Sequence, residues 1–115
     1  MLKTIPELLH EAKKNVRCIS ASVAASELKE NHGLLVDVRE PSEHQEKSAV
    51  GAINIPRGLL EMKLIESEKD PLRAIYLHCA TSARAILSAE QLSRIGYQKV
   101  SAITCNMDII QQSFQ

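Results

Sequence analysis

The sequence predicts a single α/β domain with a central parallel sheet of about five strands and helices on both of its faces. Short apolar segments alternate along the chain with stretches of helical composition, and several of the apolar segments are continuous rather than interrupted by polar residues. Continuous apolar strands are typical of sheets that are covered on both faces. Strands separated by helices favour parallel pairing through right-handed crossovers. A length of 115 residues suits one core of this kind, so residues 1–115 are expected to form one domain.

Five strands are expected, at residues 17–19, 34–38, 52–55, 74–77 and 99–103. Helices are expected between and after them, at residues 20–31, 41–47, 57–66, 82–95 and 108–114. Gly33 and Gly96 follow two of these helices, and glycine commonly ends a helix in the left-handed conformation. In such a sheet the carboxyl ends of all strands meet at one edge, where open α/β sheets bind their ligands.

The first fifteen residues predict an amphipathic helix. Thr4 and Glu7 have the spacing of a capping box, and apolar residues follow on one helical face, at Ile5, Leu8, Leu9, Ala12 and Val16. We expect this helix (residues 1–15) to pack against the rest of the domain rather than to lie on a membrane. The segment lacks the apolar centre and the small-residue cleavage site of a secretory signal, so a cytoplasmic location is expected.

The composition argues against several classes of function. Fourteen Lys and Arg residues balance fourteen Asp and Glu residues, so no net positive charge favours nucleic acid or an anionic membrane surface. Only 3% of the residues are aromatic, which leaves few side chains for stacking on bases. The three cysteines form no CxxC pair or disulfide framework, and the histidines lack the spacing of metal ligands. We therefore expect no nucleic-acid partner, no membrane partner and no metal.

The segment IYLHCATSARAILSA at residues 75–89 places a cysteine between a predicted strand and a predicted helix. The free backbone N–H groups and the dipole at the start of a helix favour a thiolate over a thiol. Residues 80–83 are small enough for their amides to surround the sulfur of Cys79, and Arg84 adds a positive charge. These features predict an anion-binding loop around a nucleophile. The alternative is a buried cysteine that acts as a small apolar residue, next to a solvated surface arginine.

Three motifs together are similar to those of single-domain rhodaneses, a family of thiosulfate and persulfide sulfurtransferases. They read LLVDVREPSEH at 34–44, GAINIPRGLLEMK at 51–63 and LHCATSAR at 77–84, and GYQKV follows at 96–100. The resemblance extends over residues 17–104. It implies a doubly wound α/β domain whose cysteine takes a sulfane sulfur from thiosulfate or a persulfide donor and becomes a persulfide. The sulfur then passes to a thiol, to cyanide or to a protein acceptor, and no metal or organic cofactor is implied.

The resemblance also implies roles for individual residues. Cys79 is the nucleophile, and Arg84 helps to hold an anionic donor. The backbone N–H groups that stabilise the sulfur come from the loop Ala80, Thr81, Ser82 and Ala83 and from the arginine itself. Asp37 and Arg39 buttress this loop by ion pairing, with an ordinary polar turn before Pro41 as the alternative.

Four other residues lie near these motifs. Arg57 follows the third predicted strand and either meets an anionic donor or is an ordinary exposed arginine. Cys105 ends the last predicted strand, which should lie beside the strand that leads to Cys79. It either accepts the sulfur of a persulfide or is a small residue where the family often has glycine. His78 is expected to point to the face of the sheet opposite Cys79, and Cys18 is expected to contribute to packing.

Two alternatives to a sulfur-transferring enzyme follow from the same motifs. Phosphatases of the dual-specificity cell-cycle type have a similar sheet but five residues between cysteine and arginine, whereas this chain has four. A tighter ring of amides suits one sulfur better than a phosphate, so phosphatase and arsenate reductase activities are disfavoured. The chain also departs from the family at Ser82 and Cys105-Asn106, where glycines are frequent, and at KSAVGA (47–52), where GHIPGA is frequent. These departures keep open a catalytically weak regulatory or sulfur-carrier module that binds a protein partner.

Overall fold

The computed structural model describes residues 1–115 throughout. Its strands are β1 (Arg17–Ile19), β2 (Leu34–Asp37), β3 (Ile53–Asn54), β4 (Ile75–His78) and β5 (Val100–Ile103). Its helices are α1 (Ile5–Lys13), α2 (Ala21–Asn31), α3 (Pro41–Glu46), a 3₁₀ helix η1 (Arg57–Leu59), α4 (Leu60–Ser67), α5 (Ala83–Ile95) and α6 (Met107–Ser113). Helices and strands therefore follow one another in the predicted order.

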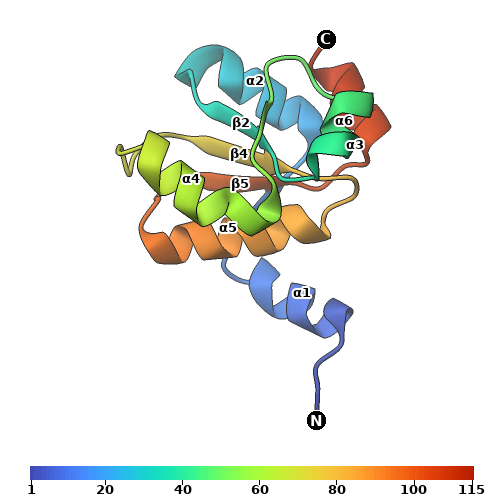
Figure 1. The fold of residues 1–115 in the computed structure, drawn as a ribbon, viewed down its shortest axis with the longest axis vertical. Helices are drawn as coiled ribbons and strands as arrows, with labels where there is room; N and C mark the ends of the chain where they lie inside the picture. The colour runs from blue at the N-terminus through green and yellow to red at the C-terminus, as the bar shows by residue number, and fades with distance from the viewer.

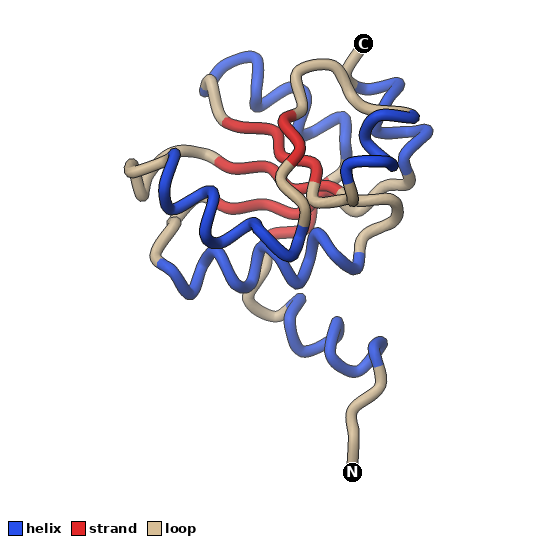
Figure 2. The backbone as a smooth tube through the Cα atoms, viewed as in Figure 1, coloured by secondary structure: helices blue, strands red, loops and turns tan.

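All five strands form one parallel sheet with the order β1-β5-β4-β2-β3. Figure 2 shows the strands side by side across the middle of the molecule, with helices on both sides. The predicted α/β architecture is thus confirmed. Because the strands are parallel, the segments that follow β2 and β4 leave the sheet at the same edge. The register places Asp37, at the end of β2, opposite His78, at the end of β4.

Two apolar clusters pack against the two faces of the sheet. The larger cluster has 15 buried residues, including residues of α1, α4 and α5, and the smaller has 7, including residues of α2 and α6. Figure 1 shows α4 and α5 below the sheet and α2 and α6 above it. Successive residues of β4 alternate between the faces, so that Ile75 and Leu77 belong to the larger cluster and Tyr76 to the smaller. Cys79 continues this alternation into the larger cluster.

The helix predicted at 57–66 is divided into two elements. Residues 57–59 form η1, in which the N–H of Leu59 donates to the carbonyl of Pro56 at 2.9 Å, and α4 begins at Leu60. The N–H of Arg57 donates to the carbonyl of Val38 at 3.0 Å, so the end of β2 holds this tight turn in place. The third strand is also shorter than predicted, since it has only two residues and pairs with β2 alone.

The prediction that α2 ends before Gly33 is confirmed, since the helix ends at Asn31, but Gly33 is not the residue that adopts the left-handed conformation. His32 adopts that conformation, with a φ of 55°. Gly33 is needed for another reason, because a Cβ atom there would lie 2.6 Å from the carbonyl oxygen of Ala74. The N–H of Leu34 donates to the same oxygen at 2.9 Å, so the chain before β2 lies directly against the chain before β4. Gly96 does end α5 with a positive φ, as predicted.

The helix α1 packs on the domain through its carboxyl-terminal half. Ala12 is fully buried, and Leu9 and Val16 pack against the larger cluster. Figure 1 shows the amino-terminal half extending away from the body of the domain, and Ile5 and Leu8 are exposed there. The predicted packing therefore holds for one half of the helix. None of the helices combines the length and the apolar character that crossing a bilayer requires.

His32→Gly is expected to increase the free energy of unfolding by about 0.5–1 kcal/mol, because glycine adopts a left-handed conformation without the steric cost of a side chain. The adjacent change Gly33→Ala is expected to decrease it by about 1–3 kcal/mol, because the new methyl group would collide with backbone. Urea unfolding followed by circular dichroism measures both values. Destabilisation by His32→Gly would contradict the assignment of strain to this position.

Candidate active site

Cys79 lies directly after β4, with its sulfur at the start of α5. The Sγ atom accepts a hydrogen bond from the backbone N–H of Ala85 at 3.4 Å. Cys79 is only 1% exposed and belongs to the larger core cluster. The first turn of a helix has N–H groups without intrahelical partners and carries the positive end of the helix dipole. The sulfur therefore lies beside groups that attract an anion.

The loop after Cys79 has free backbone donors. Ala85 lies one residue beyond the predicted loop and is the one donor that reaches the sulfur. The N–H groups of residues 80–84 make no hydrogen bond within the protein. Ser82, which precedes α5, has a φ of −170°, a value that any residue adopts, so the serine in place of a frequent glycine causes no strain. The loop thus keeps a run of unused amides beside the cysteine, as an anion-binding segment would.

Arg84 forms an ion pair with Glu43 rather than a contact with the sulfur. Its Nη1 and Nη2 atoms donate to the Oε1 and Oε2 atoms of Glu43 at 2.8 and 3.1 Å. The hydrogen bond to Glu43 raises the pKa of Arg84. The hydrogen bond from Arg84, together with one from the backbone of Glu40, lowers the pKa of Glu43 to about 2. The arginine predicted to hold an anionic donor therefore already has an anionic partner from the protein.

Glu43 is the residue of this site that the sequence analysis missed. It belongs to α3, and its carboxylate accepts the N–H of Glu40 at 2.9 Å in a capping box at the start of that helix. The sequence contained one signal, since Glu40 and Glu43 flank Pro41 with the spacing of a helix start. That signal predicts the cap but not the contact with α5.

Asp37 and Arg39 form a buried ion pair at the end of β2. The Nε atom of Arg39 donates to both carboxylate oxygens of Asp37 at 3.0 and 3.1 Å, and its Nη2 donates to Oδ2 at 2.7 Å. The Nδ1 atom of His44 lies 2.9 Å from the same Oδ2. Burial raises the pKa of Asp37, but the hydrogen bonds from Arg39 and His44 outweigh it and hold the pKa below its ordinary value.

The ion pair of Asp37 and Arg39 contacts α3 rather than the loop of residues 80–84. Arg39 also donates from Nη2 to the carbonyl of Lys47 at 2.6 Å, just beyond the end of α3. His44 ties the middle of the same helix to Asp37. The buried pair therefore holds the helix that carries Glu43, and Glu43 holds Arg84 at the start of α5.

His78 is fully buried, and neither of its ring nitrogens has a hydrogen-bond partner. It lies opposite Asp37 in the sheet and precedes Cys79, so its side chain is on the other face, as predicted. Burial lowers the pKa of His78. The imidazole is therefore neutral at pH 7 and is not placed to exchange a proton with the sulfur.

The other two cysteines lie away from Cys79. The sulfur of Cys105 accepts the N–H of Ala21 at 3.3 Å, at the start of α2, and it packs against the smaller cluster. Cys79 and Cys105 therefore face opposite sides of the sheet. Asn106 has a φ of −76° and caps α6 through its side chain, so this position needs no glycine. Cys18 is exposed, and the interpretation of it as a packing residue is wrong because β1 is an edge strand.

Arg57 follows β3 at the same edge of the sheet as Cys79. Its Nη1 atom donates to Oε1 of Glu61 at 2.7 Å, one helical turn away. The side chain is half-buried, with 31% of it exposed, so Arg57 is neither a fully exposed arginine nor free of a partner. No three His, Cys, Asp or Glu side chains converge in a way that could hold a metal ion.

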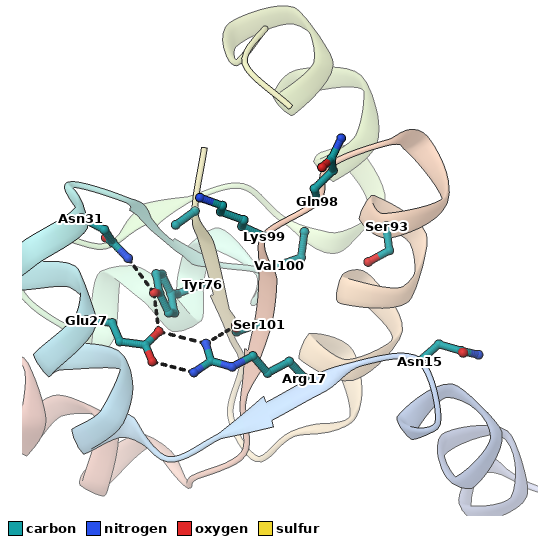
Figure 3. Close-up of a pocket in the computed structure, with 11 residues that line it drawn as sticks. Asn15, Arg17, Glu27, Asn31, Tyr76, Ser93, Gln98, Lys99, Val100 and Ser101 are labelled. Carbon is teal, nitrogen blue, oxygen red and sulfur yellow. Dashed lines mark hydrogen bonds and ion pairs between the residues drawn. The ribbon is translucent and has the colours of Figure 1, made fainter. Parts of the chain in front are cut away.

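The largest cavity is at the opposite edge of the sheet from Cys79, where β1, β4 and β5 begin. Its volume is about 560 Å³. Figure 3 shows Arg17 aimed at Glu27 within it, with bonds of 2.9 and 2.5 Å, while the hydroxyl of Tyr76 donates to the same carboxylate at 2.6 Å. A further bond of 2.9 Å joins Arg17 to Ser101. These polar groups satisfy one another, and none of them belongs to the predicted site.

Asp37→Asn is expected to destabilise the protein by about 3–5 kcal/mol at pH 7, because it leaves the buried guanidinium of Arg39 without its counter-charge. The pKa of Asp37 is lower in the folded chain than in the unfolded chain. Its stabilising contribution is therefore fully present above the unfolded pKa and is lost as the pH falls through the folded value. Urea unfolding at a series of acidic pH values tests this.

The control for that experiment is Asp108→Asn. Asp108 pairs with Lys47 on the surface, where its side chain is 74% exposed, and such pairs contribute about 0–1 kcal/mol. Equal losses of stability in the two variants would contradict the stabilising role assigned here to the buried pair.

The model of the rhodanese-like domain family matches residues 20–108. A protein named sulfurtransferase from Allochromatium vinosum is 31% identical over 67 residues, which are 58% of this chain and 61% of that protein. The polysulfide-sulfur transferase homodimer from Wolinella succinogenes has a solution structure with a TM-score of 0.76 and 28% identity, and the match covers 92% of this chain and 80% of that chain.

A structure from Rhodopseudomonas palustris described as a possible tyrosine phosphatase matches with a TM-score of 0.82, covering 98% of this chain and 92% of that one. Because the two sequences are only 22% identical, this match shows a shared fold and nothing more. The chain spans 51% and 61% of the length of the two curated relatives that it matches. Since the family match covers most of the chain and includes β2, Cys79 and Arg84, the chain belongs to the rhodanese-like domain family.

Proposed function

We propose that this protein is a sulfurtransferase in which Cys79 carries a sulfane sulfur from thiosulfate or a persulfide to a thiol, cyanide or a protein acceptor. The observation that supports it most is the placement of the Cys79 sulfur at the start of α5, beside the unused N–H groups of residues 80–84. Fixed dipoles of this kind stabilise an anion without the need to reorganise during the reaction. The family match and the sulfurtransferase name of one relative agree with it.

The proposed cycle has two displacement steps. The thiolate of Cys79 attacks the outer sulfur of thiosulfate, a new S–S bond forms, and the old S–S bond breaks so that sulfite leaves with the bonding electron pair. With a persulfide donor, the same attack releases the donor as its thiolate. An acceptor then attacks the outer sulfur on Cys79, so that cyanide leaves as thiocyanate or a thiol leaves as a persulfide. Cys79 returns as a thiolate, and no external oxidant or reductant is needed.

The loop supports the intermediate of this cycle. The persulfide of Cys79 carries its negative charge on the outer sulfur, one bond length beyond the resting Sγ atom. The N–H of Ala85 donates to Sγ of the resting cysteine, and the N–H groups of residues 80–84 are free to donate to the outer sulfur of the persulfide. The side chains of Ala80 and Ala83 are small and leave these donors accessible.

A sulfur-carrier or regulatory module that binds a protein partner is the second candidate. The 1% exposure of Cys79 favours it, because a small acceptor in bulk solvent has little direct access to the sulfur. In this case the protein partner, rather than a small molecule, would open or enter the loop of residues 80–82.

Incubation of the reduced protein with thiosulfate or an organic persulfide is expected to add one sulfur atom per chain, and cyanide is expected to remove it as thiocyanate. Intact-mass spectrometry follows the adduct, and thiocyanate is quantified in parallel. Cys79→Ser should form no adduct. A stable adduct that cyanide removes only slowly would favour the carrier, and no adduct with any sulfane donor would overturn both sulfur-handling functions in favour of a regulatory module.

Cys105→Ser is expected to load and release sulfur at the rates of the unsubstituted protein. Cys105 is bonded at the start of α2 and faces the side of the sheet opposite Cys79, so a direct transfer between the two sulfurs would require the chain to rearrange. Peptide mapping after single-turnover loading locates the added sulfur. Sulfur found on Cys105, or a slowed release in the variant, would contradict this expectation and restore a relay.

A further inference from the structure

We propose that Glu43 selects sulfur donors by charge, disfavouring dianions such as thiosulfate and favouring donors with less negative charge, such as thiosulfonates and persulfides. The inference rests on the proposed function and names the donor class of that site. Its basis is the ion pair that neutralises Arg84, the one cation placed at the start of α5.

The pairing of Glu43 with Arg84 is bidentate and occupies both terminal nitrogens of the guanidinium, at 2.8 and 3.1 Å. The two side chains are 35% and 37% exposed, so the pair lies at the surface, where an incoming donor would meet it. With a pKa of about 2, Glu43 stays an anion at every pH at which the protein would work. A donor thus meets a neutral pair rather than a free cation.

Bonds within α3, and between α3 and the end of β2, also hold Glu43 in position. Its Oε1 atom accepts the N–H of Glu40 in addition to the Arg84 bond. The helix α3 is fixed by the bond between His44 and Asp37 and by the bond from Arg39 to the carbonyl of Lys47. The bond to the N–H of Glu40 and these contacts of α3 keep the carboxylate beside Arg84.

The remaining charges near this edge do not replace the lost cation. Arg39 is buried and paired with Asp37, and Arg57 is paired with Glu61. A doubly charged donor would have to compete with the carboxylate of Glu43 for Arg84 and would be repelled by it. A donor with one negative charge, or none, is penalised less, because repulsion scales with the product of the charges. The N–H groups of residues 80–84 have no partner in the protein and would be available to the sulfur of either donor.

The test variant is Glu43→Gln, which removes the charge but keeps an oxygen that can accept the N–H of Glu40, since glutamine also closes a capping box. A matched control is Glu68→Gln. Glu68 likewise accepts a bond from an arginine, Arg73, at 2.9 Å and one from a backbone N–H, that of Asp70, at 3.1 Å. This second pair lies just before β4, at the edge of the sheet away from Cys79.

The two donors to compare are thiosulfate and methanethiosulfonate, which transfer the same outer sulfur but carry two charges and one charge respectively. Sulfite or methanesulfinate leaves with the bonding electron pair. In Glu43→Gln, kcat/KM for thiosulfate is expected to rise about threefold to fivefold through KM, and that for methanethiosulfonate by less than about twofold, as expected for removal of one partly exposed charge. Added salt should shrink the difference. Glu68→Gln should change neither value.

A fall in both values by the same factor in Glu43→Gln, or an unchanged ratio of the two donors, would overturn the inference and assign Glu43 a structural role. A second readout does not depend on turnover. Titration with sulfate, followed by the ¹⁵N–¹H resonances of residues 80–85, should give a Kd at least about threefold lower in Glu43→Gln than in the unsubstituted protein. An equal Kd would also overturn the inference. Tighter sulfate binding without any sulfur transfer would leave the charge selection standing and refute the proposed function alone.

Discussion

The organisation of this site depends on the buried carboxylate of Asp37. It lies at the end of β2, fully shielded from solvent, and accepts hydrogen bonds from the guanidinium and backbone N–H of Arg39. A buried charge of this kind is tolerated only because its lone pairs are satisfied. The contact with His44 then extends the interaction to α3. The electrostatics of the sheet edge are thus built outward from one charged group in the interior.

The role of α3 explains why polar interactions rather than apolar packing control the site. This helix has six residues, and none of them is buried. Apolar contacts cannot fix its position, so the bonds to Asp37 and from Arg39 must do so. Through Glu43, the same helix sets the charge that Arg84 presents at the start of α5. A change in the interior of the sheet can therefore alter the charge at the mouth of the site without touching the cysteine.

The fold and the position of Cys79 were predictable because both follow from local patterns. Alternating apolar and helical segments determine a parallel sheet, and a cysteine between a strand and a helix must lie at its carboxyl edge. The contact of Glu43 with Arg84 was not predictable, because the two residues are 41 positions apart and each reads as ordinary surface charge. His32 escaped prediction for a similar reason. Glycine is the expected residue at a left-handed position. Here the glycine, Gly33, stands where the backbone of Ala74 leaves no room for a Cβ atom, and the neighbouring His32 adopts the strained left-handed conformation.

Cys79 belongs both to the apolar core and to the proposed chemistry, and the two roles constrain each other. A close-packed interior has no spare room for a second sulfur atom, yet a persulfide must place one beyond Sγ. The loop that follows is less closely packed than the core, since Ala80 and Ala83 are small and only partly buried and the N–H groups of residues 80–84 have no partner. The inner sulfur belongs to the larger cluster, and we propose that the outer sulfur of a persulfide extends toward these donors. Burial of the cysteine is therefore compatible with sulfur transfer on the condition that the loop amides, and not the core, receive the transferred atom.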